Sequence, residues 1–325
     1  MLPARWKAGP AQARQGDFTD EVTWRLCRLG KPVFCRGSAK SAFFPQMPDD
    51  SSLLLGAIDT HVHSAPDVIP RKLDDLELVE QARRSGMRAV VLKNHSCSTC
   101  ARAYLLNRIQ DDVAIFGGIV LNDTIGGFNC RAVETSLKMG GSIVWMPTKS
   151  AANHQHYFGG RNGLTALNGT GLCEAVRDVI RMVADAGAIL ATGHLSALES
   201  QVVIEEALAA GVRAISVTHP EWGATSMPVE MQQRLAKSGR VFFERCLVSA
   251  RPGAQQSVTF ETIVSQIRAV GVDTTIAATD YGLPETLSPC EAMRAYIRKL
   301  AEAGFSEIEI RQMVQENPAK LLQLT

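Results

Sequence analysis

The sequence lacks any long hydrophobic run, and no window of about twenty consecutive apolar residues could span a membrane. It also lacks an excess of charge of either sign, because 34 Lys and Arg residues balance 33 Asp and Glu residues, for a net charge of +1. No stripe of basic residues alternates with aromatic ones. We therefore expect neither a membrane nor a nucleic acid as a partner.

Cysteine is sparse and scattered. The 8 cysteines of this 325-residue chain do not form the dense pattern of a disulfide framework. The segment "HSCSTC" offers His95, Cys97 and Cys100, but no second Cys-x-x-Cys pair exists to complete a structural zinc site. Residues 1–30 are mixed and charged, without the apolar segment of a secretory signal. We expect reduced thiols and a cytoplasmic protein.

Three catalytic signatures are also absent: the Gly-x-Ser-x-Gly elbow, the Walker loop and the Gly-x-Gly-x-x-Gly fingerprint. A serine hydrolase, a nucleoside triphosphatase and a dehydrogenase are therefore poorly supported. The composition, 46% hydrophobic and 21% charged, is that of an ordinary globular enzyme.

Short apolar, β-branched runs alternate with amphipathic helical segments from residue 56 onward. Residues 1–50 hold Pro, Gly, Arg and Ser without clear periodicity, and we predict an N-terminal extension there and one domain over 51–325. The runs predict strands at residues 57–62, 88–93, 113–120, 142–147, 188–193, 214–219, 240–246 and 274–279.

Strands that alternate with helices form parallel sheets. Eight such units over roughly 270 residues predict an α/β fold, a (β/α)₈ TIM barrel, which usually has about 250 residues. A doubly wound open sheet is the alternative, but it favours a Gly-rich loop after its first strand, where this chain has "THVHSAPD". The closing segment, residues 305–324, predicts a C-terminal helical cap.

The histidines are few, and each lies at or just beyond the carboxyl end of a predicted strand. The 7 positions are His61, His63, His95, His154, His156, His194 and His219. In a (β/α)₈ barrel these strand ends form the face that carries the active site. Asp280 ends the last run, in "TTIAATDYG", and a closed barrel would place it beside the first strand.

These residue types predict a metal site. Strand periodicity points His61 and His63 to the same side. Imidazole is the commonest protein ligand for Zn²⁺ and also suits Mn and Fe. A bound divalent ion lowers the pKa of its water from about 15.7 towards about 7, and a neighbouring carboxylate can carry the proton. We predict one or two divalent ions, zinc first, with Asp280 also as the catalytic proton carrier; the predicted ligands are His61, His63, His194, His219 and Asp280.

The pattern resembles that of the amidohydrolase superfamily, whose mark is His-x-His after strand 1, His after strands 5 and 6, and Asp after strand 8. Here the corresponding segments read "THVH", "TGHLS", "VTHPEW" and "ATDYG", and the resemblance spans residues 56–322. More narrowly, "GAIDTHVHSAPD", "GGIVLN" and "WMPT" resemble an uncharacterised hydrolase-like subgroup. The resemblance implies a metal-dependent hydrolase, and many barrels of this kind are homo-oligomers.

A lysine carboxylated by CO₂ bridges the two ions in binuclear members of the superfamily, usually from strand 4. Lys149 lies just past the predicted fourth strand, and Lys93 ends the second. Resemblance to the narrower subgroup favours Lys93 as a metal ligand, and a site without a bridge remains open.

Other polar residues near the strand ends are candidates for contact with ligands or substrate. Asp59 shares the facing of His61 and is expected to orient a ligand histidine. Glu244 either points into the site or pairs with Arg245 outside it. The long loop 149–171 is either a lid or a surface excursion. The predicted substrate-binding residues are Arg71, His95, Lys149, His154 and Glu221.

The sequence thus predicts a metal-dependent hydrolase that cleaves an amide, cyclic amide, lactone or other ester bond of a small molecule. Two alternatives remain open. The first is a non-oxidative decarboxylase on the same metal site, and the second is a barrel that binds a ligand without turnover.

Overall fold

A computed structural model describes residues 53–169, 171–254 and 257–324, and these belong to one compact unit. The predicted N-terminal extension, residues 1–50, lies outside the described residues. Within the described part of the chain, no helix is long and apolar enough to cross a membrane.

Each predicted run contains a β-strand. All pairings among the main strands are parallel, and they form one sheet of order β1-β2-β3 and another of order β11-β10-β9-β8-β5-β4. The predicted parallel α/β architecture is therefore confirmed. The strands are β1 (Ile58–Val62), β2 (Ala89–Leu92), β3 (Ala114–Phe116), β4 (Gly118–Val120), β5 (Ile143–Trp145), β8 (Ile189–Ala191), β9 (Ala214–Thr218), β10 (Val241–Cys246) and β11 (Thr275–Ala278).

The third predicted run divides into β3 and β4 at Gly117, where the chain passes against the start of the preceding helix, at Thr99 and Cys100. A Cβ atom on Gly117 would lie 2.8 Å from the carbonyl oxygen of Thr99, so only glycine fits this close approach. At the other sheet edges, the backbone N–H of Asp280 donates to the carbonyl of His61, and that of His63 donates to the carbonyl of Tyr281. The end of β1 therefore lies beside the segment that follows β11.

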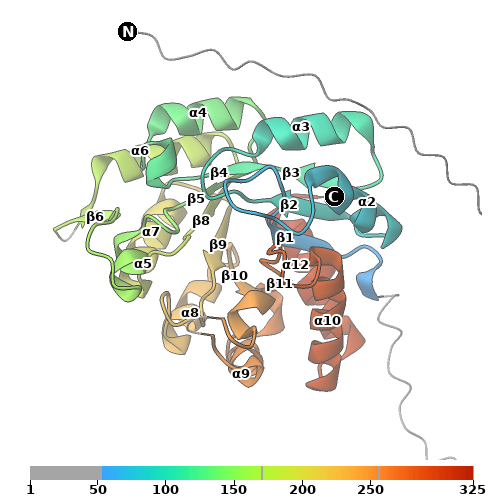
Figure 1. The fold of residues 1–325 in the computed structure, drawn as a ribbon. Helices are drawn as coiled ribbons and strands as arrows, with labels where there is room; N and C mark the ends of the chain where they lie inside the picture. The colour runs from blue at the N-terminus through green and yellow to red at the C-terminus, as the bar shows by residue number, and fades with distance from the viewer. Residues whose placement is uncertain (1–52, 170, 255–256, 325) are drawn as a thin grey trace, which may run out of the picture. The chain divides into compact units, whose positions relative to one another are not determined.

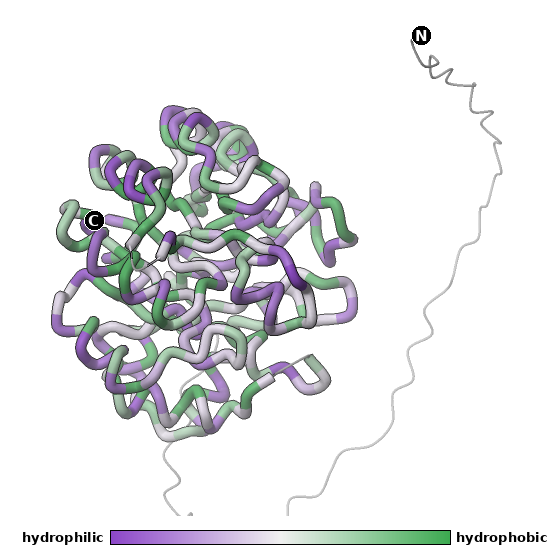
Figure 2. Tube along the Cα trace, turned by 90° about the vertical axis from the view of Figure 1, so that its left-hand side faces the viewer, coloured by the Kyte–Doolittle hydropathy of each residue, from purple (hydrophilic) through white to green (hydrophobic). Residues whose placement is uncertain are grey.

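Helices surround the strands (Figure 1), and hydrophobic and hydrophilic residues alternate along their turns (Figure 2). Capping boxes begin four of the described helices, at Asp74, Ser196, Ser288 and Ser306. The helices are α2 (Asp75–Arg84), α3 (Cys100–Ile109), α4 (Cys130–Lys138), α5 (Ala152–Tyr157), α6 (Glu174–Asp185), α7 (Ala197–Ala209), α8 (Val229–Ala236), α9 (Phe260–Val270), α10 (Pro289–Glu302), α11 (Glu307–Arg311) and α12 (Asn317–Leu321).

The C-terminal helical segment packs at the amino ends of the strands. Leu321 and Leu322 belong to one buried cluster with Ile58, Ala89 and Ile143, which are the first residues of β1, β2 and β5. The loop 149–171 holds the short helix α5 and one strand of a small hairpin, β6 (Leu167–Asn168) with β7 (Gly171–Leu172). The carboxyl ends of the main strands lie away from the C-terminal segment, and the polar side chains gather there.

Candidate metal centre

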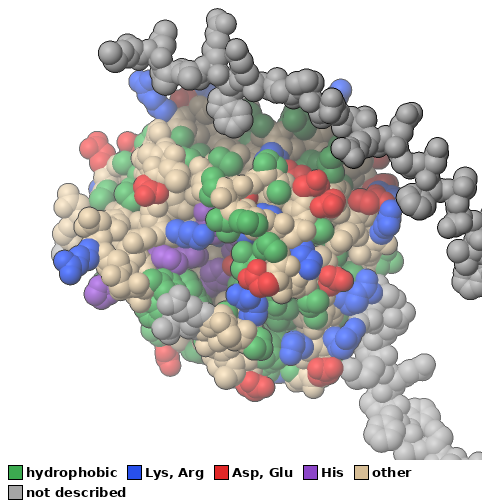
Figure 3. All heavy atoms as spheres, viewed as in Figure 1, with side chains coloured by type: hydrophobic (Ala, Val, Ile, Leu, Met, Phe, Trp, Pro, Cys, Tyr) green, Lys and Arg blue, Asp and Glu red, His purple; other side chains and the backbone are tan. Residues whose placement is uncertain are grey.

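Three imidazoles converge on the carboxylate of Asp280. One of its oxygens lies 3.1 Å from Nε2 of His61 and 3.0 Å from Nε2 of His63, and the other lies 3.2 Å from Nε2 of His219. These side chains come from the ends of β1, β9 and β11, which are far apart in the sequence. Figure 3 shows histidine side chains grouped on this face of the molecule. The parallel strands therefore bring four of the predicted ligands together.

Backbone strain marks two of these four residues. His219 has φ = 51° and Asp280 has φ = 54°, in the left-handed region that side chains other than glycine rarely adopt. His219 directly follows β9, and Asp280 follows β11 after Thr279, so the turn out of each strand aims the side chain back over the strand ends. Such strain persists where surrounding structure holds it, and it concentrates at functional sites.

His61 is held at both ring nitrogens. Its Nδ1 lies 3.0 Å from the carboxylate of Glu244, and its Nε2 lies 3.0 Å from Nζ of Lys93. Glu244 therefore points into the site and also accepts a hydrogen bond from the hydroxyl of Thr60. An Nδ1–H that donates to Glu244 leaves Nε2 with the lone pair that a metal needs.

Asp59 supports the site through the backbone. Its carboxylate accepts hydrogen bonds from the backbone N–H groups of His61 and Thr279, and from the hydroxyl of Thr279. It ties β1 to the end of β11, while Glu244 orients the imidazole ring.

Burial and neighbouring charges together set the pKa values of the cluster. Burial by itself would raise the pKa of Asp280, but the charge of His61 and hydrogen bonds from the three imidazoles hold it well below its usual range. Burial lowers the pKa of His63 to about 4, although Asp280 opposes the shift. Burial also lowers the pKa of His219 and of Lys93. Burial would lower the pKa of His61 too, but Asp280 and Glu244 together outweigh it and the pKa is raised. An ionised carboxylate surrounded by imidazoles is a set of ligand atoms that suits a divalent cation.

Two groups of side chains have ligand atoms close enough to share an ion. In the part of the chain that the structure describes, they are His61 with His63 and Asp280, and His61 with His219 and Cys246; the atoms of each group lie within 4.8 Å of one another. Cys246 is the functional candidate that the sequence analysis missed. Its position as the last residue of the run 240–246 is the signal that could have found it.

Three of the remaining histidines, His95, His154 and His194, form the edge of the site. The ring of His194 lies 5.6 Å from that of His219, and its Nδ1 lies 2.9 Å from Nδ1 of His154. His95 stacks on His63 with ring centroids 4.8 Å apart. A pocket of about 180 Å³ opens here, and its walls include His194, His219, Trp222, Ser249 and Asp280. His156 is exposed on α5.

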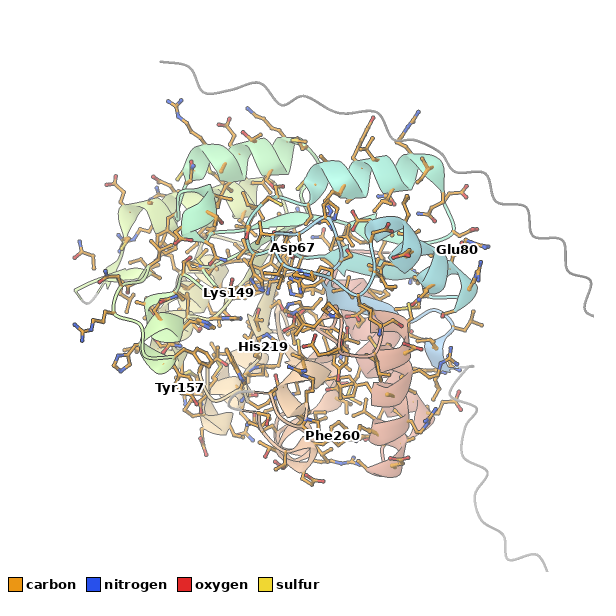
Figure 4. All side chains as sticks on the ribbon, in the orientation of Figure 1. Asp67, Glu80, Lys149, Tyr157, His219 and Phe260 are labelled. Carbon is orange, nitrogen blue, oxygen red and sulfur yellow. The ribbon has the colours of Figure 1, made fainter. Side chains whose placement is uncertain are left out.

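The other predicted substrate-binding residues fall in different surroundings. The guanidinium of Arg71 lies 2.7 Å from the carboxylate of Asp67 and 3.2 Å from Nδ1 of His63. Lys149 is exposed, and Figure 4 shows it on the same face as His219. Glu221 does not join the cluster, because its carboxylate is buried 3.0 Å from the guanidinium of Arg245.

Solved structures with the same fold include amidohydrolases and dipeptidases. An amidohydrolase from Pseudomonas aeruginosa superposes with a TM-score of 0.60 at 14% identity, over 84% of this chain and 98% of that one. A putative 2-pyrone-4,6-dicarboxylic acid hydrolase from Pseudomonas putida gives 0.57 at 14%, over 83% and 98% of the two chains. A probable dipeptidase from Pseudomonas aeruginosa gives 0.58 at 12%, over 84% and 96%. These superpositions show that the chain shares the α/β fold of these proteins.

The sequence itself matches a family model that includes the His-x-His segment and Glu244. No curated protein matches the chain. Residues 56–244 match the model of a family described as "Family of unknown function (DUF6282)". Since the match spans more than half of the chain, the protein belongs to this family.

Proposed function

We propose that the chain is a metal-dependent hydrolase that cleaves an amide, cyclic amide, lactone or other ester bond of a small molecule on a (β/α)₈ barrel. The observation that carries the proposal is the convergence of three imidazole Nε2 atoms on Asp280 at the strand ends. The closed barrel is supported by the hydrogen bonds that join the end of β1 to the segment after β11.

The donor set fits a divalent cation. Around an ion with bonds of about 2.0–2.2 Å to nitrogen and oxygen, neighbouring ligand atoms lie roughly 3.0–3.5 Å apart. The Nε2–oxygen separations of 3.0–3.2 Å at Asp280 have this spacing. We assign His61, His63, His219 and Asp280 as ligands, with His194 beside them and Lys93 as the bridging candidate. Zinc is the proposed ion, because imidazole-rich sites favour it.

A divalent ion held there would supply a water of lowered pKa and a Lewis acid for the scissile bond. The residues of the chain do the remaining work. Asp280, ionised and adjacent to three imidazoles, accepts the proton of the attacking water on a carboxylate oxygen and returns it to the leaving group. Glu244 keeps the ring of His61 oriented while this occurs.

The substrate is proposed to carry an anionic group that binds Lys149. No described carboxylate forms an ion pair with Lys149. Burial, and after it the charge of Lys149, lower the pKa of His154 to about 4. Arg71 is less suited to this role because Asp67 already neutralises it. Substitution of Lys149→Met should raise KM for carboxylate substrates about tenfold, whereas Lys149→Arg should restore it; an unchanged KM would contradict this assignment.

A decarboxylase is the second candidate, favoured by one observation. The guanidinium of Arg71 lies 3.2 Å from Nδ1 of His63. A positively charged side chain therefore contacts the proposed ligand His63 on the ring nitrogen that does not face Asp280. The two reactions are separated by screening carboxylate-bearing esters, lactones and amides for both hydrolysis and CO₂ release. Release of CO₂ without hydrolysis of any compound would replace the hydrolase proposal.

The first experiment measures metal content by elemental analysis of protein purified without added metal. We expect one or two divalent ions per chain in the wild type and none in the His61→Ala/His63→Ala double variant. The matched control is His156→Ala, an exposed histidine on α5, which should keep the full content. Metal-free wild type, even after soaking with Zn²⁺ or Mn²⁺, would overturn the proposal and favour a barrel that binds a ligand without turnover.

A further inference from the structure

Cys246 is a buried thiol at the edge of the proposed metal centre. It is the last residue of β10 and is fully buried. Its Sγ lies 3.5 Å from Nδ1 of His61, and its other contact is a long one of 3.9 Å to the carbonyl oxygen of Glu244. The sulfur is therefore directed at an imidazole rather than at the aliphatic side chains that usually surround a packed thiol.

The thiol and the two imidazoles lie close enough to one another to share an ion. A site with bonds of about 2.3 Å to sulfur and about 2.1 Å to nitrogen separates these atoms by roughly 3.6 Å. The ligand atoms of Cys246, His61 and His219 all lie within 4.8 Å of one another, so a small inward shift would bring them onto one ion. His61 belongs to both groups, so the thiol of Cys246 and the carboxylate of Asp280 approach the same imidazole ring.

We propose that Cys246 is a sulfur ligand of this metal centre and binds the ion as a thiolate beside His61 and His219. The inference rests on the proposed function, because it presupposes an ion at the cluster. Coordination breaks the S–H bond, forms a sulfur–metal bond and releases the proton to solvent. A thiolate among imidazoles selects softer ions, so the centre should prefer Zn²⁺ and Co²⁺ over Mn²⁺ and Mg²⁺.

The other described cysteines provide the comparison. Cys246 alone among them belongs to a group of potential metal ligands within the described residues. Cys290, at the start of α10, is also buried but belongs to neither group. It is therefore the matched control for the loss of a buried thiol.

The test uses Co²⁺ as the probe, because thiolate coordination to Co²⁺ produces a charge-transfer absorption that imidazole and carboxylate ligands do not. The metal-depleted full-length protein is titrated with Co²⁺ and followed by absorption spectroscopy and by elemental analysis. We expect a charge-transfer band that grows with bound Co²⁺ in the wild type and in Cys290→Ala. The variants Cys246→Ser and Cys246→Ala should lose the band, keep some bound Co²⁺, and bind it at least about tenfold more weakly.

The outcomes separate this inference from the proposed function. Bound Co²⁺ without a charge-transfer band in the wild type, or a band that survives in both Cys246 variants, would overturn the sulfur ligand and leave the histidine–aspartate centre standing. Failure of the wild type to bind Co²⁺ at all would overturn both. Circular dichroism of the two variants checks that the loss of the band does not arise from unfolding.

Discussion

At the residue scale, the imidazole of His61 is held at both ring nitrogens. Glu244 engages Nδ1, Lys93 and Asp280 approach Nε2, and the backbone N–H donates to Asp59. A carboxylate behind a ligand imidazole sets its tautomer and raises its basicity. The ring therefore needs little reorganisation to bind an ion, and Glu244 should contribute to metal affinity without touching the metal.

Substitution of Glu244→Gln should weaken metal binding by about 10- to 100-fold, because the neutral amide still accepts from Nδ1 but no longer raises the basicity of the ring. Competition with a chromophoric chelator measures the affinity. Glu230→Gln, which removes an exposed carboxylate on α8, is the matched control and should bind metal as the wild type does. An affinity in Glu244→Gln equal to that of the control would show that the ring is oriented by other contacts.

At the scale of single elements, strand β10 contributes side chains both to the proposed metal centre and to the packing behind it, because successive side chains of a strand point to opposite faces. Glu244 faces the proposed metal centre, and Arg245 faces the surrounding helices. There Arg245 pairs with Glu221 and donates to Gln232 of α8 and Gln266 of α9. This buried network joins the strand to two helices behind the site.

Removal of one partner should leave the other charge buried and unpaired. We expect Glu221→Gln to lower the free energy of unfolding by about 3–5 kcal/mol, with metal content unchanged in the folded protein. Urea unfolding and elemental analysis measure the two quantities. The double variant Glu221→Gln/Arg245→Met should recover part of the stability, since neither charge then remains. Normal stability combined with loss of metal would instead place Glu221 in the site.

Metal binding should act on the whole molecule, because the proposed ligands come from the ends of β1, β9, β10 and β11. An ion that binds the folded chain and not the unfolded one stabilises it through mass action. At a free metal concentration about 100 times Kd, this linkage contributes about 2.7 kcal/mol. The cluster would thus connect strands whose sequence positions span most of the described chain.

Thermal unfolding of the metal-depleted protein should therefore shift to higher temperature on addition of Zn²⁺ and return on addition of a chelator. The His61→Ala/His63→Ala variant should show no such shift, because it lacks two of the ligands. Calorimetry with and without metal measures both proteins. Equal shifts in the wild type and the double variant would mean that Zn²⁺ binds elsewhere on the chain.

The sequence by itself determined which segments are strands and which polar residues end them. The runs around His61, His219 and Asp280 are apolar and β-branched, and helices that end near glycine separate them. Both signals, the hydrophobic periodicity and the residues that end a helix, are contained within each short segment of sequence. Parallel strands then placed these residues at one edge.

Only the tertiary structure decided which side chains meet beyond the strand ends. Glu221 stands two residues after His219, yet it turns to Arg245, because the left-handed backbone at His219 redirects the chain. Glu244 and Cys246 reach His61 from a strand about 180 residues away. Such contacts depend on how neighbouring strands are staggered and packed. The local sequence pattern that predicts each strand does not specify which strands lie beside it or in what register.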